Sequence, residues 1–138
     1  MTARAVKIMT LPERGSGMEM ERFAEYWIGT HGSLALANPP TRDRLWRMEM
    51  APNLGTSAVP GYAVARFDGG GCIWFRDEEA LRAEFSDSYY AQVLAPDEKR
   101  FTNPTVSRGI PTRELAVWWR PSGKIAAPVA LLRNEDRN

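Results

Sequence analysis

Residues 23–34 read FAEYWIGTHGSL, and this stretch is the centre of a pattern that predicts an amphipathic helix over residues 18–35. Its apolar side chains recur at steps of three and four positions, as they do on the buried face of a helix. The protein's only histidine, His31, follows Trp27 by four positions and therefore shares that face. Periodicity leaves two roles open for His31: a core residue with a satisfied ring, or a proton-transfer group in a pocket. The apolar positions are Met20, Phe23, Ala24, Trp27, Ile28, Leu34 and Ala35.

Four segments outside this helix have the composition of β-strands. Residues 4–11, RAVKIMTL, precede the helix, and residues 42–51, RDRLWRMEMA, follow it with apolar and polar side chains in alternation. A third strand is expected at residues 72–75, CIWF, after a glycine-rich turn at residues 68–71. The fourth is expected at residues 112–119, TRELAVWW.

Helical spacing returns between the third and fourth strands. Asp77 can cap a helix over residues 78–85, and shorter helical pieces are expected at residues 89–94 and 96–101. The order strand, helix, strand, strand, helix, strand predicts an α+β fold of the ferredoxin-like β-α-β-β-α-β type. Such a subunit has a four-stranded antiparallel sheet with its helices on one face.

The other face of that sheet has no helix to cover it. Residues 112–119 are apolar on both of their faces, which indicates that the second face is buried as well. A homodimer with two sheets facing each other would bury it. The alternative is a monomer whose own C-terminal tail, residues 120–138, covers the sheet.

The overall composition narrows the classes of partner. The formal net charge is +1, with 18 basic and 17 acidic residues mixed along the chain, which disfavours nucleic acid and acidic membranes as partners. The single cysteine, Cys72, excludes an intrachain disulfide and disfavours a thiolate zinc site. With no apolar signal segment and no apolar run of membrane-spanning length, we expect a cytoplasmic protein.

Four blocks of sequence follow one another along the chain: Phe23-x-x-Tyr26-Trp27-x-x-x-His31-x-x-Leu34, Phe67-Asp68-Gly69, Phe75-x-Asp77-x-x-Ala80-Leu81 and Asp97-Glu98-x-x-Phe101. In this order and at this spacing they resemble the EthD family of dimeric α+β barrels, and the resemblance covers about residues 5–119. It implies a domain over residues 1–119, a homodimer that forms a barrel, a pocket between the sheet and the helices of each subunit, and a tail over residues 120–138 that can act as an arm.

The resemblance favours the catalytic interpretation of His31, because family pockets open where the first helix ends. A neutral imidazole can give and take a proton at cellular pH. Tyr26 is a second catalytic candidate at the pocket mouth, although a merely packed tyrosine fits the pattern too. Asp68 is a third candidate, able to orient His31, although Asp-Gly is also ordinary turn chemistry. Asp97 and Glu98 fit either acid–base work or capping of a helix after Pro96.

Aromatic and soft apolar side chains are expected to bind a flat, hydrophobic substrate. No second histidine accompanies His31 and no flavin, haem or nicotinamide motif occurs, so we predict neither a metal nor a cofactor. No Gly-x-Ser-x-Gly motif of a serine hydrolase occurs either. The candidate substrate-binding residues are Trp27, Trp46, Met48, Trp74 and Phe101.

Three functions follow as hypotheses. The first is a cofactor-independent enzyme acting on an aromatic, polyketide-like or lactone substrate as a cyclase, isomerase or dehydratase, with His31 as the proton shuttle. The second is an oxidoreductase, either a cofactor-free oxygenase or an accessory part of a monooxygenase system, since EthD proteins are named from an ether-degrading cytochrome P450 system. The third is a dimeric binding protein for a hydrophobic ligand. Related families include cyclases, isomerases, dehydratases and oxygenases, so the resemblance implies the fold more firmly than the reaction.

Overall fold

The structure is a computed structural model that describes residues 5–56 and 59–113. The described part contains four strands, five α-helices and two short π-helical segments. Along the chain these are β1 (Val6–Leu11), α1 (Met20–Glu25), η1 (Tyr26–His31), α2 (Gly32–Ala37), α3 (Pro39–Arg44), β2 (Leu45–Pro52), β3 (Gly69–Phe75), α4 (Glu78–Ser86), η2 (Tyr90–Leu94), α5 (Ala95–Phe101) and β4 (Arg108–Arg113).

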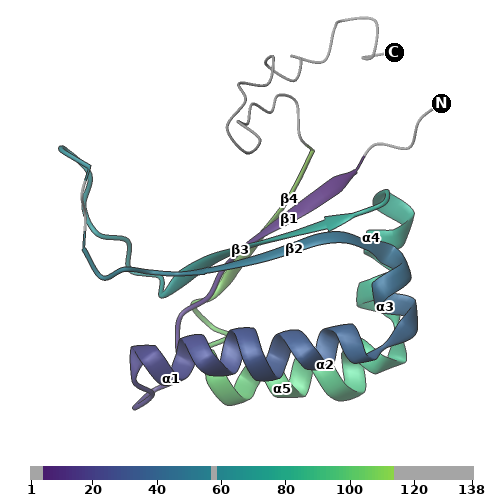
Figure 1. The fold of residues 1–138 in the computed structure, drawn as a ribbon, viewed down its shortest axis with the longest axis horizontal. Helices are drawn as coiled ribbons and strands as arrows, with labels where there is room; N and C mark the ends of the chain where they lie inside the picture. The colour runs from purple at the N-terminus through teal and green to yellow at the C-terminus, as the bar shows by residue number, and fades with distance from the viewer. Residues whose placement is uncertain (1–4, 57–58, 114–138) are drawn as a thin grey trace, which may run out of the picture.

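The strands form one antiparallel sheet in the order β2-β3-β1-β4, and the helices lie on one of its faces (Figure 1). This arrangement confirms the predicted ferredoxin-like α+β fold. Pro111 lies in β4, which is an edge strand, where the missing N–H of a proline costs no hydrogen bond on the open side. The predicted strand over residues 112–119 begins earlier than expected, and residues 114–119 and the tail 120–138 lie outside the described residues.

The helices follow the predicted ones with shifted boundaries. In place of the single helix predicted over residues 18–35, α1, η1 and α2 follow one another without a break, and Glu19 occupies the N-cap position. η2 and α5 are also continuous, with Pro96 inside the first turn of α5, where a proline is tolerated. The predicted cap of α4 is confirmed, because the Asp77 carboxylate accepts a hydrogen bond from the Ala80 N–H at 2.8 Å.

One local prediction was wrong, and one helix was not predicted. Helix α2 ends at Ala37, and Pro39 begins the additional helix α3, because a proline at the first helical position needs no N–H partner. The glycine run was expected to be a turn, but Gly69 to Gly71 form the first part of β3.

The glycines of β3 are explained by the aromatic ring above them. A Cβ atom on Gly69 would lie 2.6 Å from Cζ3 of Trp27, and one on Gly71 would lie 3.1 Å from Cζ2 of the same ring. The strand therefore passes directly beneath Trp27, which is 6% exposed. Trp27 packs in turn on Phe23, and Phe23 packs on Phe101, so these three rings form a buried cluster that joins the first and last helices to each other.

Candidate active site

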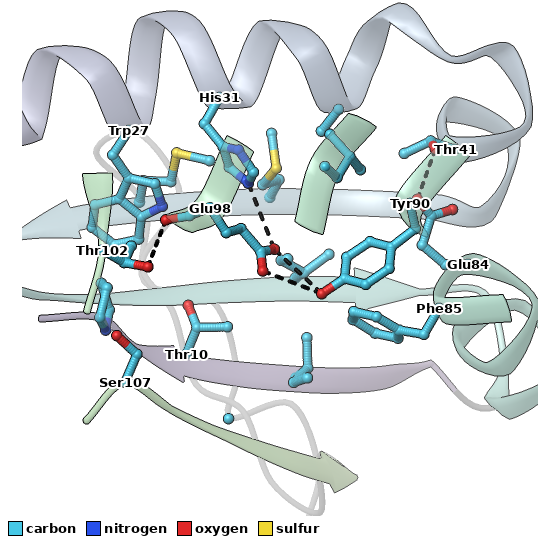
Figure 2. A pocket seen from close by; sticks show the side chains of 18 of the residues that line it. Thr10, Trp27, His31, Thr41, Glu84, Phe85, Tyr90, Glu98, Thr102 and Ser107 are labelled. Atoms are coloured by element: carbon cyan, nitrogen blue, oxygen red, sulfur yellow. Dashed lines mark hydrogen bonds and ion pairs between the residues drawn. The ribbon is translucent and has the colours of Figure 1, made fainter. Parts of the chain in front are cut away.

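A cavity of about 340 Å³ lies between the sheet and the helices. The sheet contributes aliphatic and thioether side chains to one wall, and the helices contribute aromatic rings and most of the polar groups to the other (Figure 2). This mixture suits an apolar ligand that is held by a few polar contacts. Its lining includes Ile8, Thr10, Trp27, His31, Ala35, Thr41, Leu45, Met48, Met50, Ile73, Phe75, Glu84, Phe85, Tyr90, Leu94, Glu98, Phe101, Thr102 and Ser107.

His31 stands at the end of η1 with its side chain 12% exposed. Its Nδ1 atom lies 2.9 Å from Oδ2 of Asp97, a carboxylate on α5 that is 5% exposed. An ionised carboxylate only accepts hydrogen bonds, so Nδ1 carries the proton in this contact and the neutral ring keeps its lone pair on Nε2. The ring also packs on Phe101, with 5.0 Å between the centroids. These contacts fix the orientation and the tautomer of the imidazole.

Tyr26 forms a hydrogen bond with the other oxygen of the Asp97 carboxylate. Its hydroxyl donates to Oδ1 of Asp97 at 2.5 Å, and this hydrogen bond and the nearby negative charge raise the pKa of Tyr26. Both oxygens of Asp97 therefore accept a hydrogen bond from the first long helix. Tyr26 itself does not line the cavity, and it contacts the site through Asp97 and through its ring, which packs on Phe101 with 5.1 Å between the centroids.

The second ring nitrogen of His31 faces another carboxylate. Nε2 lies 3.9 Å from Oε1 of Glu98, and the Tyr90 hydroxyl lies 3.3 and 3.4 Å from the two Glu98 oxygens (Figure 2). Burial raises the pKa of Glu98, while the neighbouring His31 opposes that shift. Burial and the charge of Glu98 together raise the pKa of Tyr90, so its hydroxyl stays protonated and acts as a donor.

The π-helical form of η1 is part of this arrangement. Such segments insert extra backbone into a helix and are frequent at functional sites. Here the segment ends at the histidine, and the following Gly32 lies against the Met50 and Met48 methyl groups, at 3.4 and 3.8 Å from the position of a Cβ atom. The helix therefore approaches the sheet closely at the same point where His31 enters the cavity.

Three of the predicted substrate-binding residues, Trp27, Met48 and Phe101, line the cavity. Trp46 does not, contrary to the alternation that placed it with Met48. A bulge between Leu45 and Arg47 shifts the register of β2 against β3, and the Trp46 side chain is 62% exposed.

Trp74 also lies away from the cavity, on the opposite face of the sheet. In β3 it alternates with Ile73 and Phe75, which do line the cavity. Its ring stacks with two cations, Lys7 Nζ at 5.2 Å and Arg47 Cζ at 5.0 Å from the centroid.

The predicted partnership between Asp68 and His31 is not present in the structure. Asp68 accepts a hydrogen bond from the Arg14 N–H at 2.7 Å, and its own N–H donates to the Pro12 carbonyl at 2.9 Å. These bonds join the segment before β3 to the segment after β1, outside the cavity. Asp97 occupies the orienting position that was expected for Asp68.

Tyr90 and Glu84 were not among the predicted site residues, and Asp97 and Glu98 were considered only with helix capping as the alternative. Asp97 follows Pro96 in the first turn of α5, so its sequence position indicates a helix cap equally well. Glu84 is 5% exposed and accepts from Thr41 at 2.7 Å and from Arg44 at 2.9 Å. The Asp97-Glu98-x-x-Phe101 spacing was the available signal, because it places a carboxylate and a ring together on the helix that faces His31.

The described residues contain no group of three or more histidine, cysteine or acidic side chains able to hold a metal ion. In the same part of the chain, every helix is too short or too polar to cross a membrane. The polar groups in and beside the cavity include one imidazole, its two carboxylate neighbours and the hydroxyls around them. Such a set can move protons to and from a bound molecule.

The sequence model of the EthD domain matches residues 15–105. The chain belongs to the EthD family. No curated protein matches it in sequence. Among solved structures, an EthD family protein from Bacillus halodurans is similar over 80% of this chain and 98% of its own, with a TM-score of 0.60 and 18% identity.

Two further solved structures are similar to this EthD chain. A dimeric ferredoxin-like protein from Thermobifida fusca, of unknown function, has a TM-score of 0.57 and 15% identity over 81% of this chain and 92% of its own. SnoaB, a cofactor-independent oxygenase from Streptomyces nogalater, has a TM-score of 0.54 and 10% identity over 81% of this chain and 94% of its own. At such identities the likeness establishes the shared fold.

Proposed function

We propose that this EthD protein is a cofactor-independent enzyme that transfers protons on a small, flat, hydrophobic substrate. The observation that carries the proposal is the orientation of His31. Asp97 holds Nδ1 at 2.9 Å, so the basic Nε2 atom is directed to the cavity side, near Glu98. A carboxylate that orients an imidazole in this way also stabilises the imidazolium that forms when Nε2 takes a proton.

The lining of the cavity supports the substrate class. Two aromatic rings, those of Trp27 and Phe101, and the thioether of Met48 line the cavity. Such surfaces bind aromatic, polyketide-like or lactone molecules through apolar contact and stacking. The cavity volume of about 340 Å³ falls in the range of small-molecule sites.

The proposed chemistry begins with removal of a proton next to a carbonyl. His31 Nε2 takes the proton from carbon, and the electron pair moves to the carbonyl oxygen to give an enolate. Isomerisation, dehydration and aldol cyclisation all share this first step, so one imidazole serves each of them. General acid–base catalysis of this kind contributes a factor of about 10² to 10⁴ in rate.

The test measures exchange of α-protons for deuterium in simple carbonyl compounds by NMR in D₂O. The probes are 2-tetralone, 2-indanone and α-angelica lactone, and the exchange rate without protein is subtracted. We expect the parent protein to accelerate exchange of at least one probe and His31→Gln to reduce the acceleration at least about 100-fold. Ser33→Ala, an exposed position on the same helical run, is the control and retains the parent rate. Tight probe binding without exchange would instead identify a binding protein.

A cofactor-independent oxygenase is the second candidate, because SnoaB has this fold. The same imidazole can remove the proton of a phenol or an anthrone, and the resulting carbanion reacts with O₂ without help from a cofactor. Oxygen consumption with anthrone as substrate, measured with an oxygen electrode, separates the two candidates. Exchange without oxygen uptake supports the isomerase, dehydratase or cyclase class.

We further propose that two copies pair through the face of the sheet that the helices leave uncovered. On this face Met9 and Ile110 are directly opposite each other on neighbouring strands and are 37% and 47% exposed. Trp74 adds an aromatic ring between its two cations. The similar protein from Thermobifida fusca is dimeric. Exposed apolar groups gathered on one face are typical of protein interfaces.

A further inference from the structure

Glu98 lies beside His31, the proposed proton-transfer group, although the two residues are far apart in the sequence. Its helix, α5, brings Asp97 and Glu98 to opposite nitrogens of one imidazole: Oδ2 of Asp97 lies 2.9 Å from Nδ1, and Oε1 of Glu98 lies 3.9 Å from Nε2. Asp97 is buried and does not line the cavity. Glu98 lines the cavity with its side chain 38% exposed, so a bound molecule can reach it.

We propose that Glu98 is a second catalytic proton-transfer group that shares one proton with His31, with Tyr90 as the residue that positions it. The inference rests on the proposed function of the same cavity and assigns it a reaction class, the 1,3-shift of a proton between carbon and oxygen. Its substrates are therefore flat ketones or lactones that lose a proton from carbon and gain one on oxygen in the same site, or enols that undergo the reverse transfer.

The proton balance of this step is complete within the pair. With one proton between Nε2 of His31 and the Glu98 carboxylate, one group is a base and the other is an acid. The base takes the α-proton from carbon, the C–H electron pair becomes the new C=C bond, and the acid gives its proton to the carbonyl oxygen. The pair still holds one proton afterwards, now on the opposite partner. The separation of 3.9 Å allows that proton to return, through a water or the product hydroxyl, and this resets the site.

Tyr90 fixes the Glu98 side chain from the neighbouring segment η2. Its hydroxyl lies 3.3 and 3.4 Å from the two carboxylate oxygens, and its ring packs edge-on against Phe85 with 4.8 Å between the centroids. This packing limits the rotamers open to Tyr90. Glu98 is therefore held toward His31 rather than turned to solvent.

The charged and titratable groups around the pair favour a single shared proton. From the long helix, His31 itself and Tyr26 face α5. From α5, Asp97 supplies a fixed negative charge behind the imidazole. From η2, Tyr90 faces Glu98, and from α4 the charge of Glu84 acts on Tyr90 while Glu84 binds Arg44 and Thr41. On the sheet side, Glu49 forms an ion pair with Arg47, and Arg108 donates to the backbone carbonyls of residues 105–107, so both of these charges have partners of their own. Burial raises the pKa of Glu98, so this carboxyl holds a proton more readily than an exposed glutamate does.

The test is the pH profile of α-proton exchange in 2-tetralone, together with the two other probes. The parent is expected to give a bell-shaped profile, because at low pH both groups hold a proton and no base is left, whereas at high pH neither does and no acid is left. Glu98→Gln should reduce the maximal rate at least about 10-fold and remove the high-pH limb, since His31 then acts as a lone base. Tyr90→Phe should reduce the rate less and keep the bell shape.

Two variants complete the design. The double variant His31→Gln/Glu98→Gln should be no slower than His31→Gln alone, because two groups that act as a unit are lost together. Glu79→Gln removes an exposed glutamate on α4 and should match the parent throughout.

A Glu98→Gln variant that keeps the bell-shaped profile would overturn the inference, whatever its rate, and would leave the proposed role of His31 intact. Exchange that is lost in His31→Gln but unchanged in Glu98→Gln would also overturn the inference about Glu98 and leave the proposed role of His31 intact. A parent protein that accelerates exchange of none of the three probes would overturn the proposed function and this inference with it. The outcomes are thus distinguishable.

Discussion

Nδ1 of His31 lies 2.9 Å from Oδ2 of Asp97, although the two residues are 66 positions apart in the chain. The contact joins the first long helix to the last one at the wall of the cavity. Since Asp97 is buried and also accepts from Tyr26, neither partner can turn away without leaving a buried polar atom without a hydrogen bond. The proposed chemistry and the packing of the two helices therefore depend on the same carboxylate.

Asp97→Asn is expected to lower the α-proton exchange rate about 10-fold or more while the protein stays folded. The amide cannot stabilise an imidazolium, and it can accept the Tyr26 hydroxyl while presenting its NH₂ group to Nδ1 of His31. The imidazole then carries its proton on Nε2, which is no longer a base. As His31 is the only histidine, ¹⁵N NMR of its ring reports the tautomer directly. An unchanged tautomer would contradict the assigned hydrogen bond.

Gly69→Ala is expected to destabilise the fold by about 1–3 kcal/mol, as overpacking of a core does. The new Cβ atom would lie 2.6 Å from the Trp27 ring and 2.9 Å from the Ala51 carbonyl, neither of which can move freely. Gly70→Ala is the matched control, because nothing lies within 4 Å of its Cβ position, and it should shift stability by less than about 1 kcal/mol. Unfolding in urea measures both. Equal losses in the two variants would show that strand flexibility, and not contact with Trp27, selects the glycines.

Glu98→Gln is expected to stabilise the fold at neutral pH. Burial raises the pKa of Glu98, so the folded state prefers the protonated carboxyl. That preference contributes fully below the pKa of an unfolded glutamate, about 4.3, and is lost as the pH rises through the folded pKa. The glutamine amide mimics the neutral form of the carboxyl, so the gain in melting temperature should be present at pH 7 and absent near pH 4. A gain independent of pH would show that ionisation of Glu98 is not its cause.

Ile110→Glu combined with Met9→Glu is expected to weaken the proposed dimer at least about 10-fold. The two side chains are adjacent on the uncovered face, and burying two carboxylates against a second copy is costly. Analytical ultracentrifugation gives the dissociation constant, with Glu79→Lys as the control on an exposed part of α4. A parent protein that is monomeric, or a double variant with unchanged affinity, would contradict pairing through this face.

The fold could be predicted because its signals are local. The apolar stripe around residues 23–34 and the alternation in β2 each depend on a period of 3.6 or 2 residues, and the order of the elements then limits the topology. The errors occurred where tertiary contact overrides local preference. Gly69 and Gly71 have the composition of a turn, but they pair with β1 and β2 as part of β3, and the Trp27 ring leaves no space for a larger side chain at either position. Trp46 leaves the alternation of β2 because of a bulge that no neighbouring residue signals.

The candidate site could be predicted only in part, for the same reason. His31 could be predicted as a site residue because it shares the apolar face of a helix with Trp27, and the periodicity of the sequence indicates such a face directly. The position of Asp97 indicates a helix cap equally well, because its contact with His31, 66 positions away in the chain, has no effect on the local spacing of residues. Asp68 was considered for the orienting role because it lies in a family block, yet its carboxylate binds the Arg14 backbone. The chemical types of the site residues could therefore be predicted from the sequence. Which of these residues contact each other could be determined only from the fold.

The most direct test of the central claim is chemical rescue of a His31→Gly variant by free imidazole. Removing the side chain leaves space for an imidazole molecule beside Asp97 and Glu98, which can hold it through the same two contacts. The account predicts that α-proton exchange in 2-tetralone, lost in the variant, returns in proportion to added imidazole and saturates. It also predicts no such effect of imidazole on the parent. Exchange by His31→Gly at the parent rate without imidazole, or no recovery with it, would contradict the assignment of His31 as the proton-transfer group.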